Sequence, residues 1–457
     1  MATSAPLPFK KLLIANRGEI ARRIGKTAQR LGLSTVAVHS DADENAPFVR
    51  EADEKVRIGP PPPKESYLCI DAILEAAKKT GADALHPGYG FLAENEQLVA
   101  ACEGNGITFV GPPVPAMRAM GGKIESKIKM IEAGVPVVPG PVHALQSEDD
   151  AVKAADAAGY PVMLKASAGG GGIGMARCKN EKQVRQAFED AKKKGEQFFG
   201  SGKVFIEKLV ESPHHIEVQV LGDRHGNVVH LFERECSIQR RNQKVLEETP
   251  SPLLDEETRA RICEAAVKAA AAVGYSSAGT VEFVADEQRN FYFLEMNTRL
   301  QVEHPITEVT LGVDIVEWML RVAGGEKLSD ALLRGLPRNG HAIELRLCAE
   351  DPDKRFFPQP GTLTEVVWPT GEGIRVDAGV ESGSVVPPFY DSLLAKVIGH
   401  GKDRNEAITR LLAALERTSI GGLKTNLEMH KRILTDDAFR AGKTNTAFLE
   451  ERLGLKS

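Results

Sequence analysis

Residues 291–304 constrain the fold more than any other stretch, because their polar and apolar side chains alternate. Successive side chains of an extended chain point to opposite faces, so this alternation predicts a strand with one apolar and one polar face. The apolar face would hold Tyr292, Leu294, Met296, Leu300 and Val302. The polar face would hold Glu295, Asn297, Arg299, Gln301 and Glu303. A solvated surface strand also alternates, but this polar face carries carboxylates, amides and a guanidinium instead of Lys, Ser and Thr.

A second strand is predicted just before it. Residues 279–285 are β-prone, and residues 286–290 supply turn formers. A hairpin with a four-residue loop has the cross-strand pairs Val281–Met296, Glu282–Glu295, Phe283–Leu294 and Ala285–Tyr292. Its two opposed carboxylates lie roughly 5 Å apart and repel each other. A hard cation such as Mg²⁺, which also binds substrate phosphates, is the simplest way to neutralise them. The alternative is a surface hairpin with its glutamates in water.

The two carboxylates of the second strand lie too far apart along the chain to share one role. Glu295 and Glu303 are roughly 26 Å apart if the chain is fully extended. They can serve one site only as its opposite ends, or if the chain bends. We therefore assign Glu295, with Glu282, to a metal, and Glu303 to the role of a general base. His304-Pro305 is expected to end the strand, because proline supplies no ladder donor.

Length and composition are those of an ordinary globular protein. The 457 residues allow about three domains. The net charge of −5 does not favour bulk binding to nucleic acid, and no apolar run is long enough for a membrane span. The first residues do not have the pattern of a secretory signal. Six cysteines lie far apart without a CxxC motif, which predicts reduced thiols in the cytoplasm and no zinc site.

The first part of the chain alternates strands and helices. Strands are predicted at residues 11–15, 35–39, 84–86 and 107–110. Helices are predicted at residues 19–31 and 70–80. This order is typical of an α/β fold with a parallel sheet. The turn after the first strand has no GxGxxG, so a dinucleotide fingerprint is absent.

A smaller unit follows the proline-rich residues 136–141. A strand ending at Lys165 leads into a stretch with five glycines in six residues, 169–174, and residues 175–179 form another strand. The glycines cannot form a helix, and the Gly-Lys-Ser/Thr of a P-loop is missing. We interpret the stretch as a flap whose amide groups close on phosphates. A flexible linker is the alternative.

Residues 233–244 are strongly charged. They are predicted to form a loop, too polar to be a core element, whose cations and glutamines suit small oxyanions. A third domain after residue 325 is predicted to contain short antiparallel strands. One of them, residues 341–347, places Glu344 and Arg346 on one polar face.

Several motifs, taken in order, closely resemble one family, biotin carboxylase, the ATP-grasp component of biotin-dependent carboxylases. They are Lys11-Leu-Leu-Ile-Ala-Asn-Arg-Gly-Glu-Ile-Ala21, His86-Pro-Gly-Tyr-Gly-Phe-Leu-Ala-Glu-Asn95, the glycine flap, Arg240-Arg-Asn-Gln-Lys244 and Glu295-Met-Asn-Thr-Arg-Leu-Gln-Val-Glu-His-Pro305. The resemblance implies an ATP-grasp fold with three domains. These are an N-terminal parallel-sheet domain (1–122), an ATP-grasp domain (123–330) with a mobile lid (about 140–206), and a mainly antiparallel C-terminal domain (331–457).

The resemblance also implies the site residues. Those similar to ATP-binding residues are Lys123, Lys165, Gly170, Gly171, Gly172, Glu207, Lys208, Leu209, His215, Gln239, Glu282 and Glu295. Those similar to ligands of Mg²⁺ or Mn²⁺ are Glu282, Glu295 and Asn297. Those similar to the bicarbonate pocket are Lys244, Arg299, Gln301, Val302 and the base Glu303. Arg346 resembles the group that faces biotin.

Four positions depart from the usual family pattern: Gly122, Ile173, His214 and Asn242. Asn242 matches the propionyl-CoA carboxylase α chains, which the sequence resembles most. No Ala-Met-Lys-Met biotin signature is present, so we expect biotin to arrive on a separate carrier protein or domain. The resemblance further implies a carboxyltransferase partner and a homodimer. The alternatives are another ATP-grasp ligase and a nucleotide-binding module without turnover.

Overall fold

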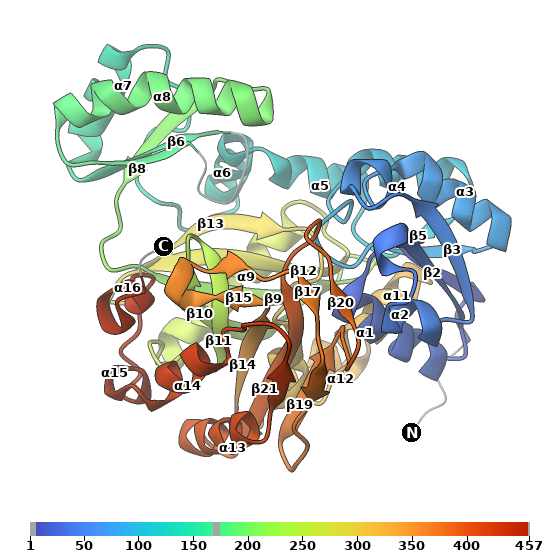
Figure 1. Ribbon diagram of the computed structural model, residues 1–457. Coiled ribbons are helices and arrows are strands. Elements are labelled where there is room, and N and C mark those ends of the chain that lie inside the picture. Colours follow the sequence, from blue (N-terminus) through green and yellow to red (C-terminus); the bar gives the residue numbers. More distant parts are fainter. Residues whose placement is uncertain (1–5, 168–173, 456–457) are drawn as a thin grey trace.

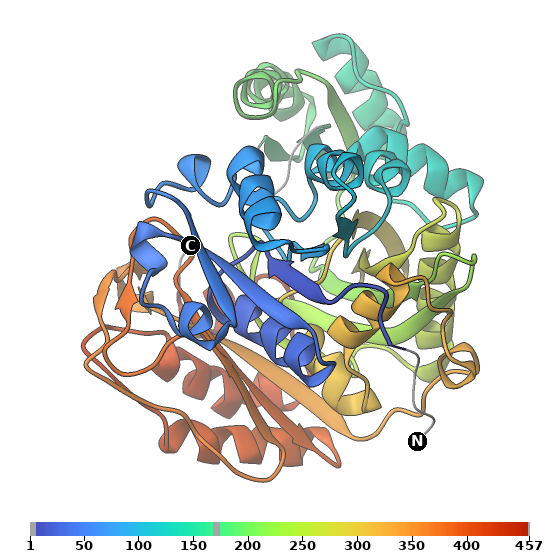
Figure 2. The same ribbon diagram turned by 90° about the vertical axis from the view of Figure 1, so that its right-hand side faces the viewer.

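A parallel five-stranded sheet with flanking helices forms the N-terminal part of the chain (Figures 1 and 2). The computed structural model describes residues 6–167 and 174–455. The sheet has the order β3-β2-β1-β4-β5 and comprises β1 (Lys11–Ile14), β2 (Ser34–Ser40), β3 (Glu54–Gly59), β4 (Ala84–His86) and β5 (Thr108–Phe109). Its helices are α1 (Gly18–Arg30), η1 (Asp41–Asp43), α2 (Pro47–Glu51), η2 (Pro63–Glu65), α3 (Ile70–Thr80), α4 (Glu96–Gly104) and α5 (Val114–Gly121).

The turn from β1 into α1 depends on Gly18. This residue has φ +65°, a left-handed conformation that glycine adopts without steric cost. The turn brings Glu19 into the first helical turn, at the edge of the central cavity described below.

A small unit projects from the rest of the molecule, at the upper left of Figure 1. Its sheet is antiparallel, with the order β7-β6-β8. Two helices, α7 and α8, pack together on it around the apolar side chains of Leu164, Phe188 and Ile206. The elements of this unit are α7 (Glu148–Ala158), β6 (Val162–Ala166), β7 (Met175–Cys178), α8 (Glu181–Phe199) and β8 (Val204–Lys208). Helix α6 (Lys123–Glu132) precedes it and packs on α5 and on β13 (Phe291–Asn297) of the central sheet.

An antiparallel eight-stranded sheet, with the order β13-β12-β9-β10-β11-β14-β21-β19, forms the centre of the molecule. Its strands are β9 (His214–Gly222), β10 (Val228–Arg240), β11 (Gln243–Thr249), β12 (Ser277–Ala285), β13 (Phe291–Asn297), β14 (His341–Cys348), β19 (Ile374–Ala378) and β21 (Leu393–Gly401). Because β11 pairs with β14, strands from both sides of residue 331 share this sheet.

Helices cover both faces of the central sheet. Helix α9 packs on β9 and β10, α10 on β14 and β21, and α13 on the other face of β14 and β21. These helices and their neighbours are α9 (Glu256–Ala271), α10 (His304–Leu311), α11 (Ile315–Ala323), α12 (Asp330–Leu333) and α13 (Arg404–Glu416). The remaining elements are β15 (Glu350–Asp351), η3 (Pro352–Lys354), β16 (Phe357–Pro358), β17 (Gly361–Thr362), β18 (Glu365–Val367), β20 (Val385–Val386), β22 (Ser419–Gly421), α14 (Leu427–Thr435), α15 (Asp437–Arg440) and α16 (Phe448–Leu453).

The architecture confirms the predicted α/β class, with a parallel N-terminal sheet and antiparallel strands toward the C-terminus. Within the described residues, none of the helices combines the length and the apolar character that a bilayer crossing requires.

The charged residues 233–244 are not a loop, which corrects the prediction from their polarity. Strand β10 runs to Arg240 and β11 begins at Gln243, so only two residues form the turn between them. The charges are tolerated inside because they are paired: Arg234 contacts Glu217 at 2.5 Å, and Glu233 contacts Arg259 at 2.8 Å. Buried charges occur when such partners neutralise them.

The hairpin of β12 and β13 forms, but its register is only partly as predicted. Val281–Met296 and Glu282–Glu295 pair as expected. A bulge after Glu282 then shifts the pairing by one residue, so Phe283 pairs with Phe293 instead of Leu294, and Ala285 with Phe291 instead of Tyr292. As a result Phe291 and Phe293, not Tyr292 and Leu294, pack in the core.

The second strand is also shorter than predicted. It ends at Asn297, the chain bends through residues 298–303, and α10 begins at His304 with Glu303 in the cap position. The bend brings Glu303 back toward the hairpin, which an extended strand could not do.

Candidate active site

A cavity of about 740 Å³ lies where the N-terminal loops, the central sheet and the C-terminal loops meet. The predicted site residues that line it are His215, Lys244, Glu282, Glu295, Asn297, Arg299, Gln301, Val302 and Arg346. Side chains from distant segments complete the wall, among them Arg17, Tyr89, Phe356 and Tyr390. The structure thus brings most of the predicted set around one opening.

The opposed carboxylates Glu282 and Glu295 differ in their surroundings. Glu282 accepts hydrogen bonds from Lys244 at 2.9 Å and Asn297 at 2.8 Å, and His215 Nε2 lies 3.1 Å away. Burial alone would raise the pKa of Glu282, but Lys244 and His215 outweigh it and the pKa is lowered.

Among the residues that the structure describes, Glu295 has no such hydrogen-bond partners. Burial and the charge of Glu282 raise the pKa of Glu295, and the charge of Lys123 offsets part of this effect. An anionic hairpin with one poorly neutralised carboxylate and a neighbouring amide offers the oxygen ligands that Mg²⁺ prefers. Glu282, Glu295 and Asn297 therefore fit a divalent cation.

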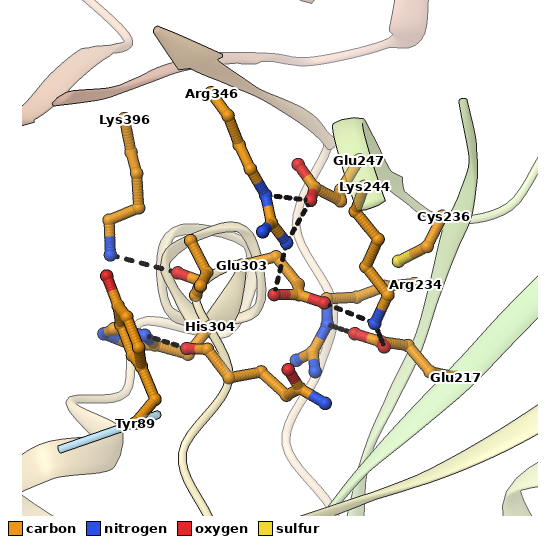
Figure 3. Close-up of polar contacts among 12 residues, drawn as sticks. Tyr89, Glu217, Arg234, Cys236, Lys244, Glu247, Glu303, His304, Arg346 and Lys396 are labelled. Carbon is orange, nitrogen blue, oxygen red and sulfur yellow. Dashed lines mark hydrogen bonds and ion pairs between the residues drawn. The ribbon is translucent and has the colours of Figure 1, made fainter. Parts of the chain in front are cut away.

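Lys244 lines the cavity and contacts three carboxylates, two of which, Glu217 and Glu303, are shown in Figure 3. Its Nζ contacts Glu217, lies 2.9 Å from Glu282 and lies 2.7 Å from Glu303. These anions outweigh the effect of burial and raise the pKa of Lys244 well above its usual value. Glu217 also binds the fully buried Arg234. The ammonium is therefore charged and held in place by its neighbours.

Glu303 lies behind the cations of the cavity wall and does not line the cavity itself. Its side chain is fully buried, and its two oxygens accept hydrogen bonds from Lys244 at 2.7 Å and Arg346 at 3.0 Å. Burial would raise the pKa of Glu303, but Lys244 and Arg346 lower it well below the usual value. In this conformation Glu303 is an ionised carboxylate held between two cations, and its assignment as a general base stays a prediction.

Arg346 and Arg299 are each held by acidic neighbours. Arg346 donates to Glu247 at 2.6 Å as well as to Glu303. Arg299 donates to Glu94, which comes from the N-terminal part of the chain, at 3.1 Å. It also donates to Gln301 at 3.1 Å and to Asn297 at 3.2 Å. Both guanidinium groups are thus fixed in orientation at the cavity wall.

A second, smaller pocket contains the predicted lysines of the phosphate side. Lys123, Lys165 and Glu207 line it together with Lys127, which the sequence analysis did not predict. Glu207 accepts from Lys165 at 2.6 Å and from Lys127 at 3.1 Å. Burial of Glu207 is outweighed by these two lysines, so its pKa is lowered. The pocket is cationic, since three lysines face one carboxylate.

Some predicted residues lie outside both pockets. Lys208 donates to the carbonyls of Gly159 and Tyr160, and the Leu209 amide donates to Pro161. Gln239 donates to the Cys236 carbonyl. Gly170, Gly171 and Gly172, with the departure at Ile173, fall outside the described residues.

Three buried charged residues behind the cavity wall were not predicted from the sequence: Glu217, Arg234 and Glu247. A signal was present for one of them, because Glu217 and Gln219 alternate with the buried Ile216, Val218 and Val220. A single glutamate on an alternating strand is normally taken for a solvated residue, and only the fold shows that this face is buried.

The opposed carboxylates, the lysine pocket and the cationic cavity wall fit one class of protein, an ATP-dependent ligase of the ATP-grasp type. Three family models cover most of the chain. They are "Biotin carboxylase, N-terminal domain" at residues 8–117, "Carbamoyl-phosphate synthase L chain, ATP binding domain" at 122–331, and "Biotin carboxylase C-terminal domain" at 344–451. The chain belongs to the biotin carboxylase family.

Individual relatives agree with this assignment. The chain is 52% identical to a biotin carboxylase of Halalkalibacterium halodurans, over 98% of this chain and 99% of the relative. It is 50% identical to the propionyl-CoA carboxylase alpha chain of Ruegeria pomeroyi, over 97% of this chain and 68% of the relative. These similar values do not confirm a particular likeness to the propionyl-CoA type.

A solved structure agrees as well. The biotin carboxylase domain dimer of the 2-oxoglutarate carboxylase of Hydrogenobacter thermophilus, in complex with MgADP, ADP and bicarbonate, has a TM-score of 0.93 and 47% identity over 98% of both chains. The ATP-grasp biotin carboxylase fold is therefore confirmed.

Proposed function

We propose that this chain carboxylates biotin on a separate carrier, using ATP and bicarbonate, with the site residues in the roles given below. The observation that carries the proposal is the clamp on Glu303. A fully buried, ionised carboxylate lies between Lys244 and Arg346, directly behind a cavity wall that also holds Arg299 and the carboxylate pair. The division into residues 1–122, 123–330 and 331–457, with the lid at about 140–206, belongs to the same proposal.

Bicarbonate is a weak nucleophile until it loses its proton. The cations of Arg299 and Lys244, with the amide of Gln301 and the backbone of Val302, line the wall that would receive it. An anion bound there competes with Glu303 for Lys244, so binding would free the carboxylate to accept the proton. The base thus becomes available only when its substrate is present.

The phosphates of ATP fit the cationic side of the site. Lys123 and Lys165 face the small pocket, and residues 207–209 lie at the end of β8, where the small unit joins the rest. His215 is placed at the cavity wall, and Gln239 and the glycines 170–172 complete the proposed nucleotide contacts. Mg²⁺ or Mn²⁺ held by Glu282, Glu295 and Asn297 would supply charge that stabilises the transferring phosphoryl group.

Arg346 is proposed to face the ureido oxygen of biotin. When the ureido nitrogen loses its proton, negative charge develops on that oxygen, and a preorganised guanidinium stabilises it. Glu247 and Glu303 fix this guanidinium before substrate arrives. The Arg346 side chain would therefore need little reorganisation at the moment of reaction.

The final acceptor and the partners are part of the proposal. Asn242 in the turn between β10 and β11 favours the propionyl-CoA type, in which a carboxyltransferase passes the carboxyl group to an acyl-CoA. The chain would act with a biotin carrier and a carboxyltransferase, as a homodimer in the cytoplasm.

The test is ATP cleavage that depends on bicarbonate and is stimulated by free biotin. We expect ADP release to require bicarbonate and a divalent cation, to become faster when biotin is added, and to be lost on chelation. Folded protein that binds ATP but shows no stimulation by biotin would contradict the proposal. ADP release with another carboxylic acid in place of bicarbonate would reveal a different ATP-grasp ligase.

A further inference from the structure

A fully buried lysine lies next to the site and has no role in the reaction proposed above. Lys396 on β21 has no solvent-exposed side-chain surface. Its Nζ donates to the carbonyl of Val302 at 3.0 Å and lies 3.0 Å from Glu19 Oε2. A second carboxylate, Asp377, is 3.9 Å away. Burial of an ammonium group costs desolvation free energy, which only close polar partners offset. The partners of Lys396 therefore indicate its role.

The contacts of Lys396 join three segments that are far apart in sequence. Glu19 begins α1 in the N-terminal part, Val302 belongs to the bend between β13 and α10, and Lys396 belongs to the C-terminal part. Figure 3 shows the lysine pointing at this bend. One side chain therefore fixes the relative position of all three segments.

Glu19 connects Lys396 to a residue of the cavity wall. Its second oxygen accepts a hydrogen bond from the hydroxyl of Tyr89, and Tyr89 lines the cavity. A residue with a Cβ in place of Gly379 would come within 2.7 Å of the Glu19 amide, so the helix start packs tightly against the end of β19. Glu19 has little freedom to move and transmits the position of Lys396 to Tyr89.

The other contact of Lys396, with the Val302 carbonyl, is next to the proposed base Glu303 in the chain. Val302 lines the cavity and is directly followed by Glu303, whose carboxylate lies between Lys244 and Arg346. The register of the sheet places Lys396 opposite Arg346 on neighbouring strands. The same face of β14 and β21 thus carries Arg346 and, through Lys396, contacts the backbone that leads to Glu303.

We propose that Lys396, held by Glu19, is a positioning residue for the reaction: it fixes the Val302 carbonyl and the Tyr89 hydroxyl, and thereby the geometry of the bicarbonate wall and of Glu303. The inference rests on the proposed function, because it assigns these residues to the same site. It does not place Lys396 in contact with substrate. Its loss should affect bicarbonate and turnover, and leave the distant lysine pocket for ATP unchanged.

The main test compares Lys396→Met, which keeps the length and removes the charge, with Lys396→Arg, which keeps the charge. Small misplacements near reacting groups cost up to about a hundredfold in rate, so we expect Lys396→Met to lose about ten- to a hundredfold in kcat/KM for bicarbonate. The KM for ATP should stay near the wild-type value. Lys396→Arg should recover part of the loss.

A matched control separates positioning from stability. Arg404 forms a buried ion pair with Glu248 at 2.6 Å on the opposite face of the same sheet. Arg404→Met should destabilise the fold and leave the KM for bicarbonate unchanged. The proposal is overturned if Lys396→Met keeps wild-type bicarbonate kinetics, if it changes the KM for ATP and for bicarbonate equally, or if Arg404→Met shows the same kinetic loss.

Glu19→Gln provides the second variant if Lys396→Met does not fold. It leaves the ammonium without its main anion and should shift the bicarbonate parameters in the same direction. Hydrogen exchange of residues 301–306 gives a readout without turnover, and we expect faster exchange in either variant. Unchanged exchange and unchanged bicarbonate kinetics in Glu19→Gln would overturn the proposal. Wild-type protein without biotin-stimulated ATP cleavage would instead contradict the proposed function, while the exchange result would still decide the positioning.

Discussion

Two adjacent glutamates of β11 point to opposite faces of the central sheet and behave differently. Glu247 faces α10 and the site, and Glu248 faces α13. Each is fully buried, and each contacts an arginine, Arg346 or Arg404, at 2.6 Å. Burial raises the pKa of Glu247 to about 7, because Arg346 offsets burial only in part and the charge of Glu303 adds to it. The same degree of burial leaves the pKa of Glu248 at about 2, because Arg404 and His341 outweigh it.

The difference lies in the number of anions that each cation serves. In the part of the chain that the structure describes, Arg404 contacts one carboxylate, and the His341 imidazole lies 2.8 Å from that carboxylate as a second partner. Arg346 is shared by Glu247 and Glu303, and Glu344 lies on the same strand face. Both oxygens of Glu344 lack a hydrogen-bond partner among the described residues.

The face toward α13 therefore holds balanced charge, which stabilises the fold. On the face toward α10, two carboxylates share Arg346, and Glu344 has no hydrogen-bond partner within residues 6–167 and 174–455. Perturbed carboxylates of the second kind are typical of functional sites.

The largest expected effect separates the two faces by activity. Glu303→Gln should lower biotin carboxylation about 10²- to 10⁴-fold, because the amide cannot accept the proton of bicarbonate. Affinity for ATP should persist, as measured by calorimetry. Glu248→Gln is the matched change on the other face and should keep its turnover. Near-normal turnover in Glu303→Gln would remove the base from the proposed mechanism.

The paired arginines give the next test. Arg346→Met should lose about a hundredfold or more in kcat/KM for biotin, as for the loss of an oxyanion donor. Arg404→Met should instead lower the free energy of unfolding by about 3 kcal/mol, since Glu248 is left buried without its main partner. Steady-state kinetics of both variants measures the loss of activity, and denaturant titration measures the loss of stability. Equal kinetic losses in the two variants would show that the faces do not differ in function.

Acid stability tests the balanced face. The folded-state pKa of Glu248 is depressed, so its contribution is present above pH 4.5 and is lost as the pH falls from 4.5 to about 2. A pKa shift of this size corresponds to a contribution of about 3 kcal/mol to the free energy of unfolding. Glu248→Gln should therefore be less stable than wild type at pH 7, and the difference should disappear in acid. A pH-independent difference in denaturant titrations would contradict the assignment.

The smallest effect is expected on the anionic face. The folded-state pKa of Glu247 is raised, so its contribution is present below pH 4.5 and is lost as the pH rises from 4.5 to about 7. In Glu247→Gln, the free energy of unfolding should therefore fall less between pH 4.5 and 7 than it does in the wild type. The change should be modest, because Glu303 and Glu344 still surround Arg346. An unaltered pH dependence would show that another group carries the proton.

The sequence predicts this face only in part. Alternation indicated that Glu344 and Arg346 share a side of one strand, and that Glu282 opposes Glu295; the described structure confirms both. Local patterns could not predict that Glu247 binds Arg346, because 99 residues separate them. Residue types could not predict the bulge after Glu282. Phe283 meets an apolar residue in either register, Leu294 in the predicted one and Phe293 in the observed one.

The error at residues 233–244 has a physical cause. Polarity was taken as evidence against burial, which holds for unpaired charges. In this sheet, partners such as Glu217 for Arg234 and Arg259 for Glu233 come from other elements. A charge pattern in a single segment does not reveal whether the fold supplies such partners.

The continuous central sheet also limits how the protein can be divided. A cut near residue 331 would separate β11 from β14 and leave two long strands with unpaired backbone groups. Such edges recruit other chains, so the halves should aggregate when expressed apart and regain solubility when produced together. The small unit carrying α7 and α8 has a sheet of its own, and exchanging it between homologues should leave the remainder folded.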